Sequence, residues 1–204
     1  MAAAFQLLDQ AGLDGVSLRK VACQLGIRAP SLYWHFKSKQ ALVDAMADAL
    51  IKDVARNVPP GQPWRATLLQ LAHEFRHAFK AHRDGARVYA GTYLATENVM
   101  RVAEVTISAL AQAGAAIDFA ATSAMDLIYY VLGFVIEEQS MPQPGAETDE
   151  LEANFLAMAE AHFPYCFQAR HFLAEPDLER RFAQGVGLLL DGIALKLPPA
   201  AQTP

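Results

Sequence analysis

The chain has 204 residues, a length that corresponds to one or two domains. Hydrophobic residues make up 53% of it, enough to bury a sizeable core, which excludes general disorder. The most apolar stretch, from Ile128 to Ile136, stops at Glu137 and is shorter than a membrane span. The first residues lack a basic segment and soon meet Asp9, unlike a secretory signal. Cys23 and Cys166 lack C-x-x-C spacing, so we expect neither a disulfide nor a cysteine metal site. This use of cysteine also leads us to expect a cytoplasmic protein.

The charge is distributed unevenly. The whole chain has a net charge of -5, but residues 1–39 hold five basic and two acidic side chains, a net charge of +3. The remainder therefore carries -8. A basic segment on an acidic chain predicts that only this segment meets the phosphates of a nucleic acid.

The first quarter of the chain predicts four helices. Ser17 and Ser38 are suitable N-caps, Gly12 and Gly26 are suitable helix ends, and Pro30 suits a first turn. The expected helices span residues 3–11, 18–25, 30–35 and 39–55. The proline-rich segment 58–63 then marks a boundary, and we expect one domain over 1–55 and a second over 56–204.

The rest of the chain also has helical periodicity, and no strand is predicted. In the first helix beyond the boundary, an apolar stripe of Leu68, Leu71, Phe75 and Phe79 should face inward. A loop with two prolines and a glycine is expected from Met141 to Asp149. The expected helices span residues 63–81, 84–94, 97–113, 117–140, 150–161 and 177–195. The sequence thus predicts an all-α protein.

Residues 17–35 form two short helices joined through Leu25, Gly26 and Ile27, with another helix before them. This arrangement is typical of a helix-turn-helix, whose second helix enters the major groove of DNA. The residues expected to pack the pair together are Leu18, Val21, Ala22, Leu25, Ile27 and Leu32. A plain helical hairpin has the same spacing and remains an alternative.

The run from Gly15 to Leu42 resembles the DNA-binding domain of the tetracycline repressor family, above all in Leu32-Tyr-Trp-His-Phe-Lys-Ser-Lys39. The run from His82 to Val88, followed by Gly91-Thr92, is similar to the ligand-binding domain of the tetracycline repressor's own subgroup, and so is Leu132 to Gln139. The resemblance implies a three-helix head with a helix-turn-helix, and a larger helical domain for ligand binding and dimerisation.

The resemblance implies DNA contacts for a set of residues around the second short helix. Arginine reads guanine bidentately, a serine reaches a base or phosphate, and alanine or proline contacts a thymine methyl. Tyrosine, histidine and lysine are suitable phosphate anchors. The implied residues are Arg19, Arg28, Ala29, Pro30, Ser31, Tyr33, His35 and Lys39. We expect Trp34 to lie in the core instead, because its neighbours already supply the outward face.

The resemblance also implies that helices 117–140 and 177–195 build a four-helix bundle in a homodimer. An apolar face on each helix is typical of obligate dimers, although an ordinary internal core has the same composition. The faces are Ala120, Ala121, Ala124, Leu127, Ile128 and Val131, and Val186, Leu188, Leu189, Leu190 and Ile193.

The expected ligand pocket is lined by Phe75, Tyr89, Thr92, Tyr93, Met100, Val105, Tyr129, Tyr130, Phe134 and Glu137. Tyr89 and Tyr129 stand where the resemblance implies metal-positioning histidines. A tyrosine stays protonated at neutral pH and is a poor Mg²⁺ ligand. We therefore expect an aromatic or polycyclic inducer bound with no metal and no further cofactor.

Two alternatives compete with a ligand-responsive repressor that an inducer releases from a palindromic operator. His73-Glu-Phe-Arg-His77 matches the H-E-x-x-H motif of zinc hydrolases. The apolar stripe places both histidines toward the polar side of their helix, however, which favours a non-enzyme. The other alternative is a ligand-binding module with little DNA function, which the basic segment 1–39 argues against.

Overall fold

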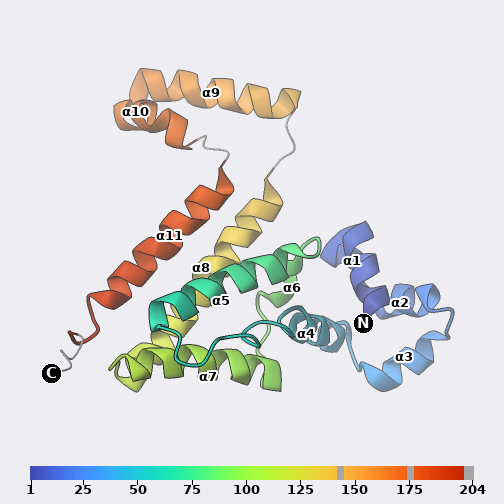
Figure 1. Ribbon diagram of the computed structural model, residues 1–204. Coiled ribbons are helices and arrows are strands. Elements are labelled where there is room, and N and C mark those ends of the chain that lie inside the picture. Colours follow the sequence, from blue (N-terminus) through green and yellow to red (C-terminus); the bar gives the residue numbers. More distant parts are fainter. Residues whose placement is uncertain (142–144, 174–176, 200–204) are drawn as a thin grey trace. The chain divides into compact units, whose positions relative to one another are not determined.

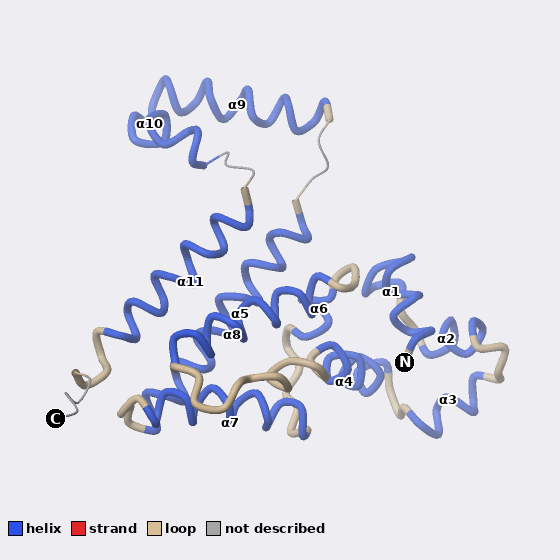
Figure 2. The backbone as a smooth tube through the Cα atoms, in the orientation of Figure 1, coloured by secondary structure: helices blue, strands red, loops and turns tan. Residues whose placement is uncertain are grey.

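A computed structural model describes residues 1–141, 145–173 and 177–199. Helices and connecting loops account for all of these residues, with no strand among them (Figures 1 and 2). The helices are α1 (Ala2–Gly15), α2 (Leu18–Gln24), α3 (Ala29–His35), α4 (Lys39–Leu50), α5 (Trp64–Lys80), α6 (Gly85–Tyr89), α7 (Glu97–Gln112), α8 (Ile117–Ser140), α9 (Ala146–His162), α10 (Pro164–Leu173) and α11 (Leu178–Ala194). The all-α prediction is confirmed.

The first three helices, which we call the head, begin and end close to the predicted residues. Ser17 accepts a hydrogen bond from the Lys20 amide and Ser38 accepts one from the Ala41 amide, so both are N-caps. The predicted stop at Gly12 is a kink rather than an end, because its φ of 69° breaks the helical path. After this kink α1 continues to Gly15.

The head has a small core of Leu18, Val21, Ala22 and Leu32, as predicted. Leu25 and Ile27 were expected in this core, but both are exposed. They lie in the turn between α2 and α3, where the short head has no further element to cover them. The prediction for these two residues was wrong because the apolar pattern does not indicate which side of the turn is covered.

Several helices of the chain differ from the sequence prediction in their bounds or in being present at all. Helix α4 ends at Leu50 instead of residue 55, and Ala55 has a φ of 60° in the turn that follows. Helix α6 ends at Tyr89 instead of residue 94, and Gly91 has a φ of 76°. Helix α10 was not predicted. The expected loop over residues 141–149 lies partly outside the described residues, and α9 begins there at Ala146.

Helices α5 to α8, which we call the body, supply most of the core. The predicted stripe of α5 is buried, with Leu68, Leu71, Phe75 and Phe79 all fully covered. Helix α8 buries Ala120, Ala124, Leu127, Val131 and Val135. The residues form two compact units, Met1–Gln139 with Val186–Pro204, and Ser140–Gly185. In the second unit, α9 contacts α10.

Candidate DNA-binding surface and ligand cavity

The residues with predicted DNA contacts lie on the outer side of the head. Arg28 is the N-cap of α3, and Pro30 occupies the first turn of that helix. All members of the set are exposed except Ala29, which is half-buried. The structure therefore places Arg19, Arg28, Ala29, Pro30, Ser31, Tyr33, His35 and Lys39 where a duplex could reach them.

Trp34 is the clearest correction to the sequence analysis. Its side chain is 89% exposed, so it is not a core residue. Leu32 fills the inward position of α3, and Trp34 lies two residues further round the helix. Sequence reasoning missed it because a tryptophan in an amphipathic helix usually faces inward.

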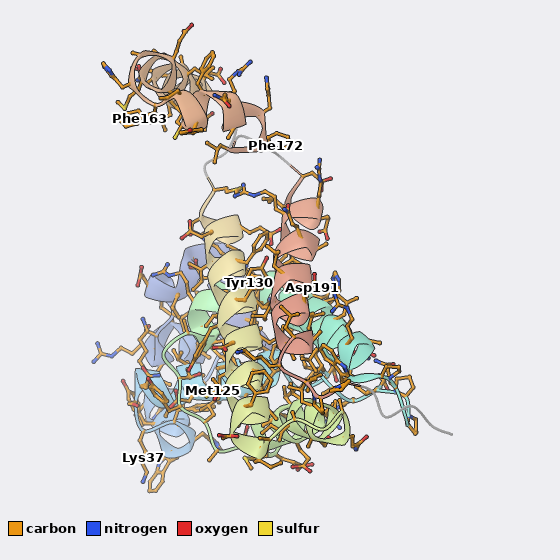
Figure 3. All side chains as sticks on the ribbon, turned by 90° about the vertical axis from the view of Figure 1, so that its left-hand side faces the viewer. Lys37, Met125, Tyr130, Phe163, Phe172 and Asp191 are labelled. Atoms are coloured by element: carbon orange, nitrogen blue, oxygen red, sulfur yellow. The ribbon has the colours of Figure 1, made fainter. Side chains whose placement is uncertain are left out.

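Two lysines follow α3 and differ in their contacts. Lys39 donates a hydrogen bond from Nζ to the Leu13 carbonyl oxygen at 3.2 Å, which joins the start of α4 to the end of α1. Lys37 is exposed and projects at the edge of the head (Figure 3). Lys37 is thus a basic residue of this surface that the sequence analysis did not select.

A cavity of about 410 Å³ lies beside the loop that joins α6 to α7. It is lined by Tyr89, Thr92, Tyr93, Leu94, Ala95 and Val99. Three predicted ligand residues, Tyr89, Thr92 and Tyr93, therefore meet in one cavity. The Tyr89 ring lies 5.1 Å from that of Phe79, between centroids, and burial followed by the charge of Asp48 raises the pKa of its phenol. Tyr89 thus remains a hydrogen-bond donor at neutral pH.

The other predicted ligand residues are distributed over the body. Phe75 is buried against Phe79, with ring centroids 5.6 Å apart, and belongs to the core. Tyr130 and Phe134 form an aromatic pair on α8, 6.0 Å between centroids. Val105 is half-buried. The exposed members are Met100, Tyr129 and Glu137.

A buried ion pair joins α5 to α8 next to this aromatic pair. Arg76 donates to both carboxylate oxygens of Glu138, at 3.0 and 2.9 Å, and the two side chains are only 5% and 7% exposed. Burial alone raises the pKa of the Glu138 carboxyl, but hydrogen bonds from Arg76 and Lys80 outweigh burial and hold that pKa below its usual value. The Arg76 guanidinium also lies over the Phe134 ring at 5.5 Å.

Hydrogen bonds join the start of α7 to the end of α4, and we call this set of contacts the α4–α7 latch. Asp48 accepts hydrogen bonds from the Thr96 hydroxyl at 2.5 Å and the Asn98 amide at 3.0 Å. Arg101 donates to the carbonyl oxygens of Ile51, Lys52 and Val54. Val99, a wall of the 410 Å³ cavity, lies between these latch residues in α7. The latch therefore connects the cavity to the helix that carries the head.

The H-E-x-x-H residues lie on α5, where the two histidines and the glutamate have different surroundings. His73 and His77 are exposed, and Glu74 accepts hydrogen bonds from the Ala55 amide and from Gln70, each at 2.7 Å. No group of three metal-ligating side chains occurs within the described ranges. Glu74 instead supports the turn at Ala55, whose positive φ is unusual for a residue with a side chain.

The fold and the two sites define a helix-turn-helix transcription regulator with a helical ligand-binding domain. Residues 1–46 match the family model for bacterial regulatory proteins of the tetR family, and residues 58–197 match that for the tetracyclin repressor-like C-terminal domain. The chain belongs to the TetR family. It is a ligand-responsive DNA-binding regulator of transcription.

Relatives and solved structures agree with this assignment. The tetracycline repressor protein class A from transposon 1721 of Escherichia coli is 34% identical, over 94% of this chain and 87% of the relative. A structure from Streptomyces coelicolor A3(2), described as a possible TetR family transcriptional regulator, aligns with a TM-score of 0.84 at 33% identity, covering 95% of this chain and 96% of that one. The Streptomyces coelicolor protein ActR in complex with actinorhodin also aligns with a TM-score of 0.84, at 26% identity, covering 98% and 95%.

Proposed function

We propose that this chain is a repressor that binds a palindromic operator as a homodimer and leaves it when an aromatic or polycyclic inducer binds. The observation that carries the proposal is the α4–α7 latch, which connects the 410 Å³ cavity to the helix that bears the head. A ligand changes operator affinity only if it binds the released arrangement more tightly than the operator-bound one. A ligand that displaces the 90–95 loop would move the start of α7 and, through Asp48, α4.

On the DNA side, we assign base reading to the start of α3 and phosphate contacts to its end. Arg28 has the fork that reads a guanine, and Ala29, Pro30 and Ser31 complete the reading edge. Arg19, Tyr33, His35 and Lys39 are phosphate contacts in this proposal. The exposed Trp34 and Lys37 join them. A single short helix makes few contacts, so useful affinity requires two heads on two half-sites.

On the ligand side, Tyr89, Thr92 and Tyr93 form the recognition edge, and the aromatic residues of α8 extend it. Actinorhodin, the compound bound by ActR, is an aromatic polycycle and fits this class. The exposed Met100, Tyr129 and Glu137 would become walls once a second copy covers α8. Phe75 supports the Phe79–Tyr89 pair from the core and takes no direct ligand contact in this proposal.

We also infer that the chain catalyses no reaction and acts in the cytoplasm, with its domain boundary near residue 55. The two family models leave residues 47–57 between them, which supports that boundary. The regulatory role of the family supports the absence of catalysis. A zinc content near zero after purification and inactivity toward peptides are the expected results.

Operator binding tests the proposal directly. An operator selected from a random DNA library should bind the protein, and Arg28→Ala should lose base preference at one position per half-site, at a cost of about 1–3 kcal/mol. Arg56→Ala removes the same charge outside the head and serves as the matched control. Unchanged base preference in Arg28→Ala would contradict direct reading by Arg28, and no selected operator would contradict the function.

A further inference from the structure

A second, larger cavity of about 740 Å³ lies where α1, the end of α4 and α5 meet. We call it the seam cavity. All of its lining residues belong to the same compact unit. It shares no lining residue with the 410 Å³ cavity, and its volume lies within the range of small-molecule sites, about 300–1,000 Å³.

One wall of the seam cavity is a preformed aromatic platform. The Phe5 ring of α1 and the His82 imidazole stack with centroids 4.2 Å apart and planes 14° apart. The platform is anchored, because the Asp9 carboxylate lies 2.9 Å from His82 Nδ1 and also accepts a hydrogen bond from the Arg83 amide. A flat ring placed against such a pair gains apolar burial and stacking without reorganising the site.

The contact with Asp9 engages Nδ1 of His82. A carboxylate in this contact accepts, so Nδ1 is the donor and Nε2 is the nitrogen left for other partners. His73 and His77, one turn apart on α5, add two more imidazoles to the lining. Imidazoles can accept from or donate to a hydroxyl group, which makes this lining well suited to a phenol.

The remaining lining disfavours a strongly charged ligand. Leu50, Val54 and Ala78 are apolar, while Lys52 and Asp53 bring opposite charges and lie 3.9 Å apart. The Glu74 carboxylate already accepts hydrogen bonds from Ala55 and Gln70. Neither an anion nor a cation therefore has a clear partner here.

We propose that the seam cavity is a second ligand site, which binds a planar aromatic phenol stacked on the outer face of the Phe5–His82 platform, with its hydroxyl hydrogen-bonded to the His77 imidazole. Its walls come from the head (α1), from α4 and from the body (α5). A ligand in it therefore contacts both parts of the chain at once. This proposal concerns binding and does not depend on the assigned DNA contacts or on the 410 Å³ cavity.

The probe for this site is 2-naphthol, titrated into the full chain by calorimetry and into protein with ¹³C-labelled histidines by NMR. The expected result is saturable binding with shifts in the His77 and His82 ring signals, each assigned by a single His→Gln variant. Ala81→Phe should fill the cavity and weaken binding by about tenfold or more. Ala66→Phe, at an exposed alanine of α5 that does not line the cavity, should leave the affinity unchanged.

Further comparisons keep the test decisive if Ala81→Phe does not fold. Phe5→Leu keeps an apolar side chain but removes the stacking partner, and it should also weaken 2-naphthol. Naphthalene, which lacks the hydroxyl, should bind more weakly than 2-naphthol. The proposal is overturned if the two alanine variants bind alike, if the imidazole signals do not move, or if Tyr93→Ala removes the binding instead.

Discussion

At the residue scale, one buried charge pair makes the body sensitive to substitution. Arg76 and Glu138 are almost fully covered, and together they join α5 to α8. Removing one side chain of the pair leaves the other charge buried without its partner. The free-energy cost of this unpaired charge is larger than the net stability that the intact pair contributes. The sequence analysis selected neither residue, because an arginine on an apolar helix gives no sign that its partner lies 62 positions away.

Glu138→Gln should lower the free energy of unfolding by about 3 kcal/mol at neutral pH. Because the folded-state pKa of Glu138 is lowered, its contribution is present above the pKa of the unfolded chain and is lost as the pH falls through the folded-state value. The difference between wild type and variant should therefore shrink in acid. Urea unfolding at several pH values measures it, with the exposed neighbour Glu137→Gln as control. An equal effect of both variants would contradict the prediction.

Trp34 provides a second residue-scale prediction, because its exposure makes it a reporter of the head. DNA that covers this indole should change its fluorescence, whereas Trp64, half-buried at the start of α5, should be unaffected. Trp34→Phe should remove the signal change and weaken operator binding by about 1 kcal/mol through lost contact area. A signal that persists in Trp34→Phe would place the change at Trp64 and remove Trp34 from the interface.

At the element scale, the connection of α4 to α7 determines how the head responds to the body. Two tertiary features keep the turn after α4 in place, the Arg101 contacts with its carbonyl oxygens and the Glu74 contact with the Ala55 amide. The latch residue Asp48 lies on α4 itself, two residues before that helix ends at Leu50.

Asp48→Ala removes both carboxylate acceptors of the latch, leaves only the Asp48 carbonyl oxygen for the Asn98 amide, and should uncouple the ligand cavity from the head. We expect the ratio of operator Kd values with and without a bound aromatic inducer to fall by about tenfold, the effect of about 1.4 kcal/mol of lost coupling. Asp44→Ala, whose side chain is bonded within α4 to Gln40, is the matched control and should keep the ratio. If Asp48→Ala responds like wild type, ligand binding reaches the head by another route.

The faces of α8 and α11 show a further difference from the sequence analysis. Of the expected dimer residues, Ala120, Ala124, Leu127, Val131, Val186, Leu190 and Ile193 are buried within the chain, so the expected dimer face is largely core. The exposed apolar residues of these helices include Met125 and Tyr129 on α8, which were not in the expected face, and Leu188 on α11, which was. Figure 3 shows Met125 at the surface of α8 and Asp191 on α11.

Leu188, which is 68% exposed, is therefore the better position to test assembly. Leu188→Glu should bury a carboxylate in an apolar contact and raise the dimer Kd by about 100-fold or more. Light scattering on dilution measures this dimer Kd. Leu69→Glu, which places the same charge at an exposed leucine of α5, should leave the dimer intact. A dimeric Leu188→Glu protein would place the interface elsewhere.

At the scale of the whole molecule, the apolar character of α8 has two possible interpretations, a membrane span and a dimer interface. It is 24 residues long and contains an 18-residue window with a mean hydropathy of 1.7, enough by length and composition to cross a bilayer, and a third of that window is buried within the chain. A helix that buries one face in its own core and leaves another apolar face open also suits a dimer interface. Membership of the TetR family favours the second interpretation.

Release from the operator should not require magnesium, because Tyr89 and Tyr129 are poor ligands for a hard cation and Glu137 is a single carboxylate. Aromatic inducers should therefore act equally in EDTA and in magnesium buffer, and Tyr89→Phe should weaken them by about 1 kcal/mol. Fluorescence titration with tetracycline, with and without magnesium, tests the opposite case, in which ligand binding depends on the metal. Tight tetracycline binding that EDTA abolishes would contradict metal-free recognition.

The sequence alone determined the features that depend on local rules. Caps at Ser17 and Ser38, the break at Gly12, the stripe of α5 and the helix-turn-helix with its basic residues all follow from the chemistry of near neighbours. These signals act over a few residues, so they can be read along the chain.

Only the tertiary structure decided which apolar faces are covered and which distant polar groups meet. Trp34 and Leu25 are residue types common in protein cores, yet the small head leaves them exposed, while most of the expected dimer face is internal core. The latch at Asp48 and the ion pair of Arg76 with Glu138 join residues 48 and 62 positions apart. Burial and long-range pairing depend on how helices pack against one another, and periodicity within one helix contains no information about its neighbour.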